Sequence, residues 1–235
     1  MPDNNDITLL TQYAGGDEYA FTMLVNRYIN LVYSTALRQV CNPSHAEEIT
    51  QAVFIILTQK AKSLSPKTIL SGWLYQTARL TAENFLRSEI RRQHREQEAY
   101  MQSTLTESDT ASWEHVAPLL DEAMGRLGEA DRNAIVLRFF ENKTPQEVAT
   151  TLKLNEVTAR KRVSRALEKL RKFFTKRGVV LPIAVLTTAI SANSVQAAPV
   201  GLAATISVTA AKGAAIAATV STLVKGTLKI IGVLT

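Results

Sequence analysis

The densest cluster of chemically active side chains in this sequence lies around residue 160. Residues 155–177 hold nine lysines and arginines against two glutamates, a local charge of +7. Lysine and arginine bind phosphate oxygens, arginine also reads guanine edges, and serine and threonine hydroxyls reach phosphates or bases. This chemistry suits binding to duplex DNA. The alternative interpretation of the cluster is a helix whose basic face is simply solvated. The candidate DNA-contacting residues are Thr158, Arg160, Lys161, Ser164 and Arg165, together with Arg162, which either binds phosphate or braces the domain.

Two short helices joined by a tight turn are expected to position these side chains. Thr144 precedes a proline and has a glutamate three residues later, which predicts a capping box with proline at the first helical position. Residues 152–155 indicate a turn, and Asn155 is expected to cap a long second helix. On that helix the small and apolar residues share one face, which comprises Ala159, Val163, Ala166, Leu167 and Leu170. This pattern is typical of a helix-turn-helix, whose second helix enters the major groove.

The rest of the chain divides into unlike parts. Residues 6–98 show helical apolar spacing, with breaks at 42–44, where Ser44 is the expected N-cap, and at 63–67. No stretch alternates with a period of two long enough to predict a strand. We therefore expect an all-α fold of two small helical domains, a flexible linker between them and an apolar, alanine-rich C-terminal extension. The expected boundaries are 1–98 for the first domain, 99–117 for the acidic linker, 118–177 for a second domain opening at Pro118, and 178–235 for the extension.

Composition separates these parts and excludes several functions. The net charge of +6 balances 27 basic against 21 acidic residues, and the C-terminal extension has three lysines and no acidic residue. A single cysteine, Cys41, rules out a disulfide framework and a multi-cysteine zinc site. The histidines are scattered, and no nucleophile arrangement, metal-ligand spacing or glycine-rich phosphate loop is present. We expect no catalysis, metal or cofactor, and the acidic N-terminus, which lacks a secretory signal, predicts a cytoplasmic protein.

Several segments together resemble one known family, the bacterial RNA polymerase sigma factors of the extracytoplasmic-function (ECF) type. In the family's order, region 2.2 is resembled by residues 46–54, region 2.3 by 73–79 and 85–87, region 2.4 by 87–95, and region 4 by 144–170. The resemblance implies a first domain that docks on core RNA polymerase and opens the −10 promoter element. It implies a second domain that reads the −35 element as duplex, through the helix-turn-helix residues named above. Core polymerase and promoter DNA are the implied partners, and an anti-sigma factor is a further candidate.

The resemblance also assigns residues to these tasks. Polymerase contact falls on Glu48 and Gln51, three apart on one helix face, with Phe54 packing behind them. Opening the −10 element needs a pocket for an unstacked base and cations for the backbone. The candidates are the 60–71 loop, Trp73, Tyr75, Arg79, Asn84, Arg87, Arg91, Arg92 and Arg95. Burial in the core is the alternative for the two aromatic residues, and Leu80 and Asn84 stand where the family commonly has Asn and Asp.

Two questions stay open at this point. The extension 178–235 is apolar, but neither of its apolar runs matches the roughly 20 clearly apolar residues of a membrane span. It either associates weakly with a membrane, packs as alanine-rich helices on the rest of the protein, or is disordered. The competing function for the chain is a helix-turn-helix regulator that binds an operator without polymerase. The first domain distinguishes a sigma factor from such a regulator, because the regulator has no need of the helix that carries Glu48 and Gln51.

Overall fold

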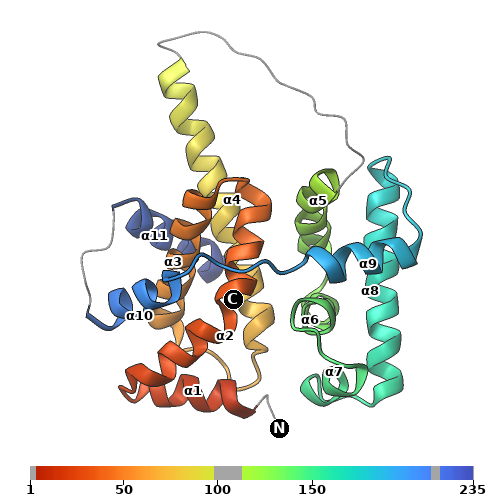
Figure 1. The fold of residues 1–235 in the computed structure, drawn as a ribbon, viewed down its shortest axis with the longest axis horizontal. Coiled ribbons are helices and arrows are strands. Elements are labelled where there is room, and N and C mark those ends of the chain that lie inside the picture. Colours follow the sequence, from red (N-terminus) through yellow and green to blue (C-terminus); the bar gives the residue numbers. More distant parts are fainter. Residues whose placement is uncertain (1–3, 98–112, 213–217, 235) are drawn as a thin grey trace.

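Helices form all the regular structure in the residues that the computed structural model describes, which are 4–97, 113–212 and 218–234. The prediction of an all-α fold is confirmed. Figure 1 shows two groups of helices side by side, with an extended segment crossing from one to the other. The helices are α1 (Asn4–Ala14), α2 (Glu18–Val40), α3 (Pro43–Lys60), α4 (Leu70–Gln97), α5 (Trp113–Arg126), α6 (Glu129–Ile135), the π-helix η1 (Val136–Phe140), α7 (Pro145–Thr151), α8 (Glu156–Lys176), α9 (Ile183–Asn193), α10 (Leu202–Lys212) and α11 (Ala218–Leu234).

Helices α1 to α4 form the first domain around a core of large apolar side chains. Phe21, Ile49, Phe54 and Leu74 are among its fully buried members. The chain breaks expected near 42–44 and 63–67 separate α2 from α3 and α3 from α4. The N-cap of α3 is Asn42, whose side chain accepts a hydrogen bond from the His45 N–H at 3.2 Å. The expected cap at Ser44 is therefore wrong, because Pro43 takes the first helical position and places the cap two residues earlier, at Asn42.

Helices α5 to α8 and η1 form the second domain. Helix α5 begins at Trp113, five residues before the start expected at Pro118, so it includes the last residues assigned to the linker. Residues 98–112, which make up most of the expected linker, lie outside the described residues. The π-helix follows α6 directly, and the Glu141 N–H closes it by donating to the Val136 carbonyl at 3.0 Å. This wider turn buries both Phe139 and Phe140.

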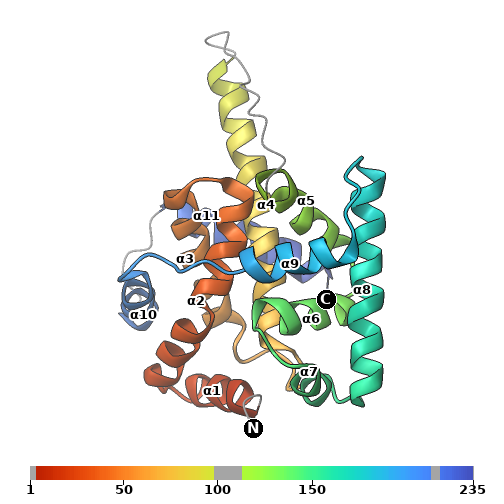
Figure 2. The same ribbon diagram turned by 45° about the vertical axis from the view of Figure 1, so that its right-hand side comes forward.

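The C-terminal extension packs on both domains. Helix α9 contacts α8 and η1 of the second domain, α10 contacts α2 and α3, and α11 contacts α3 and α4 of the first. Figure 2 shows α9 beside α8, with α10 and α11 over the other group of helices. Of the three interpretations of this segment, packing as helices on the rest of the protein matches the structure. Across the described helices, none combines the length and apolarity needed to cross a membrane.

Candidate nucleic-acid interface

Helices α7 and α8 form the expected helix-turn-helix. The Thr144 hydroxyl accepts a hydrogen bond from the Glu147 N–H at 3.3 Å, and Glu147 Oε2 accepts one from the Thr144 N–H at 2.7 Å. The turn passes through Lys153, whose φ of 54° lies in the left-handed region. Asn155 then begins α8 by accepting a hydrogen bond from the Thr158 N–H at 2.7 Å. Both predicted caps are confirmed, so local sequence alone sets where the second helix starts.

The solvent side of α8 carries most of the predicted duplex-reading side chains. Lys161 and Arg165 are exposed and have no ion-pair partner within the described part of the chain. Two exposed cations that form no ion pair with the described residues are free to neutralise phosphate. Arg162 differs because it is half-buried and lines a cavity toward the first domain, a position that favours bracing. The exposed members of the predicted set are Thr158, Arg160, Lys161, Ser164 and Arg165.

Val157 belongs to the same surface and was not predicted from the sequence. Its side chain is 62% exposed, one helical turn before Lys161. An apolar side chain on a DNA-facing helix suits the methyl group of thymine. The available signal was positional: Val157 is apolar but lies outside the spacing of the buried stripe formed by Ala159, Ala166 and Leu170.

The predicted polymerase-contacting residues lie on α3. Glu48 and Gln51 are both half-buried. Phe54 is fully buried, and its ring meets that of Phe21 edge-on with centroids 6.4 Å apart. The structure thus places Phe54 as a packing residue, which matches the role expected for it.

The predicted −10 residues on α4 are spread over different environments. Trp73 is half-buried, and Tyr75 is fully buried, so for Tyr75 the core alternative holds in this conformation. Arg79 lies against α5, where a Cβ built on Gly125 would be 3.0 Å from its guanidinium carbon. The remaining candidates are Asn84, half-buried beside α11; Arg87, exposed and paired with Glu83 at 2.5 Å; and Arg91, Arg92 and Arg95, whose side chains lie outside the described residues.

A buried ion pair joins the two domains. Arg38 of α2 donates from Nε to Asp121 Oδ2 of α5 at 3.0 Å and from Nη2 to Asp121 Oδ1 at 3.3 Å. The side chains are 5% and 2% exposed. The Tyr75 hydroxyl donates to the same carboxylate at 2.5 Å, and Arg38 Nη1 donates to the Ser194 carbonyl at 2.6 Å. One carboxylate therefore holds together α2, α4 and α5, and its arginine partner also holds the extension.

Burial and charge act together on the ionisation of this network. Burial raises the pKa of Tyr75 well above its ordinary value, and the neighbouring carboxylate of Asp121 raises it further, so the hydroxyl stays a donor. Burial works against the charge of Arg38, but Asp121 more than offsets it, so the pKa of the guanidinium is raised overall. The charged, fully hydrogen-bonded state is the stable one while the two domains stay together.

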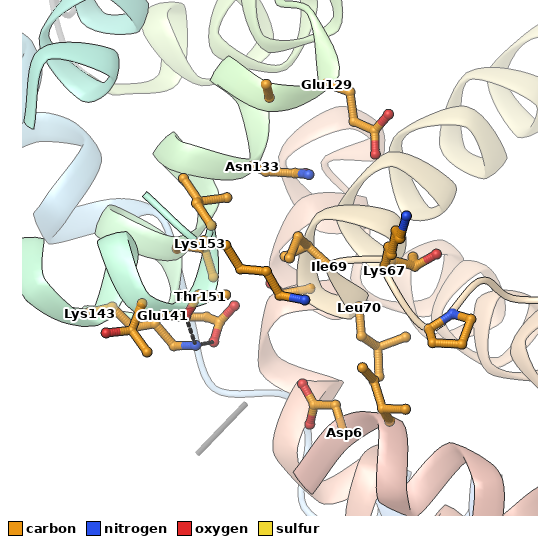
Figure 3. Close-up of a pocket in the computed structure, with 18 of the residues that line it drawn as sticks. Asp6, Lys67, Ile69, Leu70, Glu129, Asn133, Glu141, Lys143, Thr151 and Lys153 are labelled. Carbon is orange, nitrogen blue, oxygen red and sulfur yellow. Dashed lines mark hydrogen bonds and ion pairs between the residues drawn. The ribbon is translucent and has the colours of Figure 1, made fainter. Parts of the chain in front are cut away.

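A cavity of about 640 Å³ separates the domains at the other end of their interface. Figure 3 shows Lys153 extending toward Ile69, with Asp6 on the first-domain side. Burial raises the pKa of Glu141 in this cavity, although Lys143, which it meets at 3.3 Å, acts in the opposite direction. The 60–71 loop contributes Pro66, Lys67, Thr68, Ile69, Leu70 and Ser71 to the lining. Charged groups of both signs and open space make this end of the interface less tightly packed than the end at Arg38.

Comparison with known proteins identifies both domains. The family description Sigma-70 region 2 matches residues 24–93, and Sigma-70, region 4 matches residues 123–172. The ECF RNA polymerase sigma factor SigK of Mycobacterium sp. (strain KMS) is 31% identical over 173 residues, which span 69% of this chain and 87% of that protein. The ECF RNA polymerase sigma-E factor of Haemophilus influenzae is 29% identical over 176 residues, 70% of this chain and 93% of that one.

A solved structure of CnrH in complex with the cytosolic domain of CnrY aligns with 73% of this chain and 98% of that one, at 21% identity and a TM-score of 0.37. The matched family regions end at residue 172, so helices α9 to α11 lie beyond them. The chain has both family regions in the order found in sigma factors, and the second region carries the exposed, cationic α8. The names of its relatives agree with this assignment. The chain belongs to the ECF family of RNA polymerase sigma factors, which direct core polymerase to promoters and start transcription there.

Proposed function

We propose that this sigma factor divides its work between two surfaces of named residues. Helix α8 reads the −35 element in the major groove through Thr158, Arg160, Lys161, Ser164 and Arg165, with Val157 as an added apolar contact. Helix α3 contacts core polymerase through Glu48 and Gln51. Arg79 and Asn84 of α4 act on the −10 element once they are free of their present neighbours. The protein is not itself an enzyme and acts in the cytoplasm, where polymerase and promoter DNA are.

The exposed cationic side of α8 is the observation that carries this proposal. Lys161 and Arg165 stand in solvent on a helix whose start is set by Asn155 and by the turn at Lys153. A helix that is capped, follows a shorter helix through a tight turn and carries unpaired cations has the geometry that docks in a major groove. Arg162 supports the division of labour, because its half-buried position at the cavity suits bracing of the domain.

Gln51→Lys tests the polymerase-contacting role of α3. We expect this variant to lose binding to core polymerase and promoter-dependent transcription, because an added charge is desolvated at the contact without a partner. Its binding to duplex −35 DNA should be unchanged, since α8 is untouched. Gln59→Lys is the matched control, an exposed glutamine on the same helix given the same substitution. Equal polymerase binding by the two variants would remove α3 from the polymerase interface.

A further inference from the structure

Residues 194–201, named here the strap, cross α2 between α9 and α10 without regular secondary structure. Three side chains of α2 bind the main chain of the strap. Arg38 donates to the Ser194 carbonyl at 2.6 Å, and Asn30 Oδ1 accepts from the Ala198 N–H at 2.9 Å. Between them, Ser34 Oγ accepts from the Gln196 N–H at 2.6 Å and donates to the Gln196 carbonyl at 2.9 Å.

The spacing of these bonds is regular on both partners. The α2 residues recur every fourth position and the strap residues every second position. Four helical residues rise about 6 Å, and two extended residues advance about 6.6 Å. The two repeats therefore stay in register along the helix. Ser34 and Arg38 are buried at this contact, so the strap is a fitted part of the fold.

Beyond the strap, the extension covers the first domain with apolar side chains. Leu202 and Ile206 of α10 are buried, and α10 packs on α2 and α3. Helix α11 packs on α3 and α4 through a helically spaced buried face, made by Val220, Leu223, Val224, Thr227 and Ile231. Both tail helices thereby contact the helix that carries Glu48 and Gln51.

Burial around α3 shows the consequence of this cover. Val53 is 0% exposed and Ile55 is 5% exposed. Residues two positions apart in a helix point about 200° apart around its axis, so these two side chains are buried on nearly opposite sides of α3. A helix at the surface of a domain ordinarily keeps a polar face toward water. On α3 the apolar side chains are buried around much of the helix because α10 and α11 pack against it in addition to α2 and α4.

Helix α11 also reaches a predicted −10 residue. A Cβ built on Gly226 would be 2.5 Å from Asn84 Nδ2, so the backbone of α11 lies directly against that side chain. The extension carries no acidic residue at all, so it does not resemble a nucleic acid in charge. Its apolar contacts with the first domain instead compete with another protein for the same surface. The solvent side of α8 stays exposed beside this cover.

We propose that residues 178–234 are an intramolecular inhibitor that keeps core polymerase off α3 by seating α10 and α11 on the first domain, with the strap as their anchor. This rests on the proposed role of α3 in polymerase binding. The chain forms its complex with polymerase only after α11 leaves α3 and α4. Duplex DNA contact by α8 is independent of that release.

Gly226→Gln tests the proposal by removing the space that α11 needs beside Asn84. The matched control is Gly232→Gln in the same helix, where a Cβ meets nothing within 4 Å. We expect Gly226→Gln to bind core polymerase about tenfold more tightly than the wild type, because a larger fraction of the chain is competent. The control should match the wild type. Amide hydrogen exchange across residues 218–234 reports whether α11 is released, and duplex −35 binding should be equal in all three chains.

Ser34→Val gives a second route to the same state by removing both hydrogen bonds to Gln196. It must raise polymerase affinity in the same direction as Gly226→Gln. Faster exchange in α11 without a gain in polymerase affinity, in either variant, overturns the inhibitor. Failure of all chains to bind polymerase, released or not, overturns the polymerase-binding role itself and is thereby distinguished from failure of the inhibitor.

Discussion

Asp121→Asn is expected to part the two domains without unfolding either of them. The substitution leaves Arg38 charged, 5% exposed and without a carboxylate partner. Breaking one partner of a buried ion pair costs about 3–5 kcal/mol, because the remaining charge is buried and uncompensated. Separation of α5 from α2 returns the charge of Arg38 to water. We therefore expect the lost free energy to appear as separation of the two domains. The cavity at the other end of the interface leaves that end with fewer contacts to break.

Small-angle X-ray scattering measures this opening as an increase in radius of gyration. Glu122→Gln is the control, a neighbouring acid on α5 that is half-buried and paired with exposed Arg126 and Arg177. Surface pairs of this kind contribute about 0–1 kcal/mol, so the control should keep the wild-type radius. An Asp121→Asn chain with the wild-type radius and the wild-type unfolding midpoint would show that the Arg38 and Asp121 pair does not hold the domains together.

Arg165→Ala and Lys161→Ala are expected to weaken promoter binding in two different ways. Loss of an arginine that reads a base costs about 1–3 kcal/mol and relaxes the preference at one base pair. Loss of a lysine that binds phosphate lowers affinity across all sequences and reduces the slope of log affinity against log salt by about one. Both side chains are exposed, so neither substitution should change stability.

Titration of duplex −35 DNA at several salt concentrations separates the two effects. Arg126→Ala is the matched control, because it removes the same charge from an exposed position on α5. We expect that variant to keep both the affinity and the sequence preference of the wild type. Wild-type binding by both α8 variants would mean that another surface contacts the DNA.

Local signals in the sequence were enough to predict the helix-turn-helix. The capping box at Thr144 and the cap at Asn155 depend on residues within three positions of each other. Asn142 has a φ of 53°, in the left-handed region that asparagine adopts more readily than most residues. Such features can be predicted from sequence because their hydrogen bonds form within one turn of chain and do not depend on the rest of the fold.

Contacts between distant segments could not be predicted in this way. Arg38 meets Asp121 across 83 positions, and Ser34 meets Gln196 across 162. Nothing near any of these residues indicates its partner, so the two domains were expected to be held only by a linker. The extension left three interpretations open because its weakly patterned apolar residues suit a membrane surface or a protein surface equally well. Its placement is decided by contacts with α2, α3, α4, α8 and η1, and those surfaces come together only in the folded protein.

Run-off transcription by purified core polymerase on a library of genomic fragments tests the central claim most directly. Wild-type chain and Gly226→Gln are added separately, and the transcripts are mapped at their starts. We predict transcripts that depend on the added chain and begin downstream of one shared pair of sequence elements, with more product from Gly226→Gln. Binding of either chain to DNA fragments, without any transcript above that of core polymerase alone, would contradict a sigma factor and identify a regulator that binds DNA without polymerase.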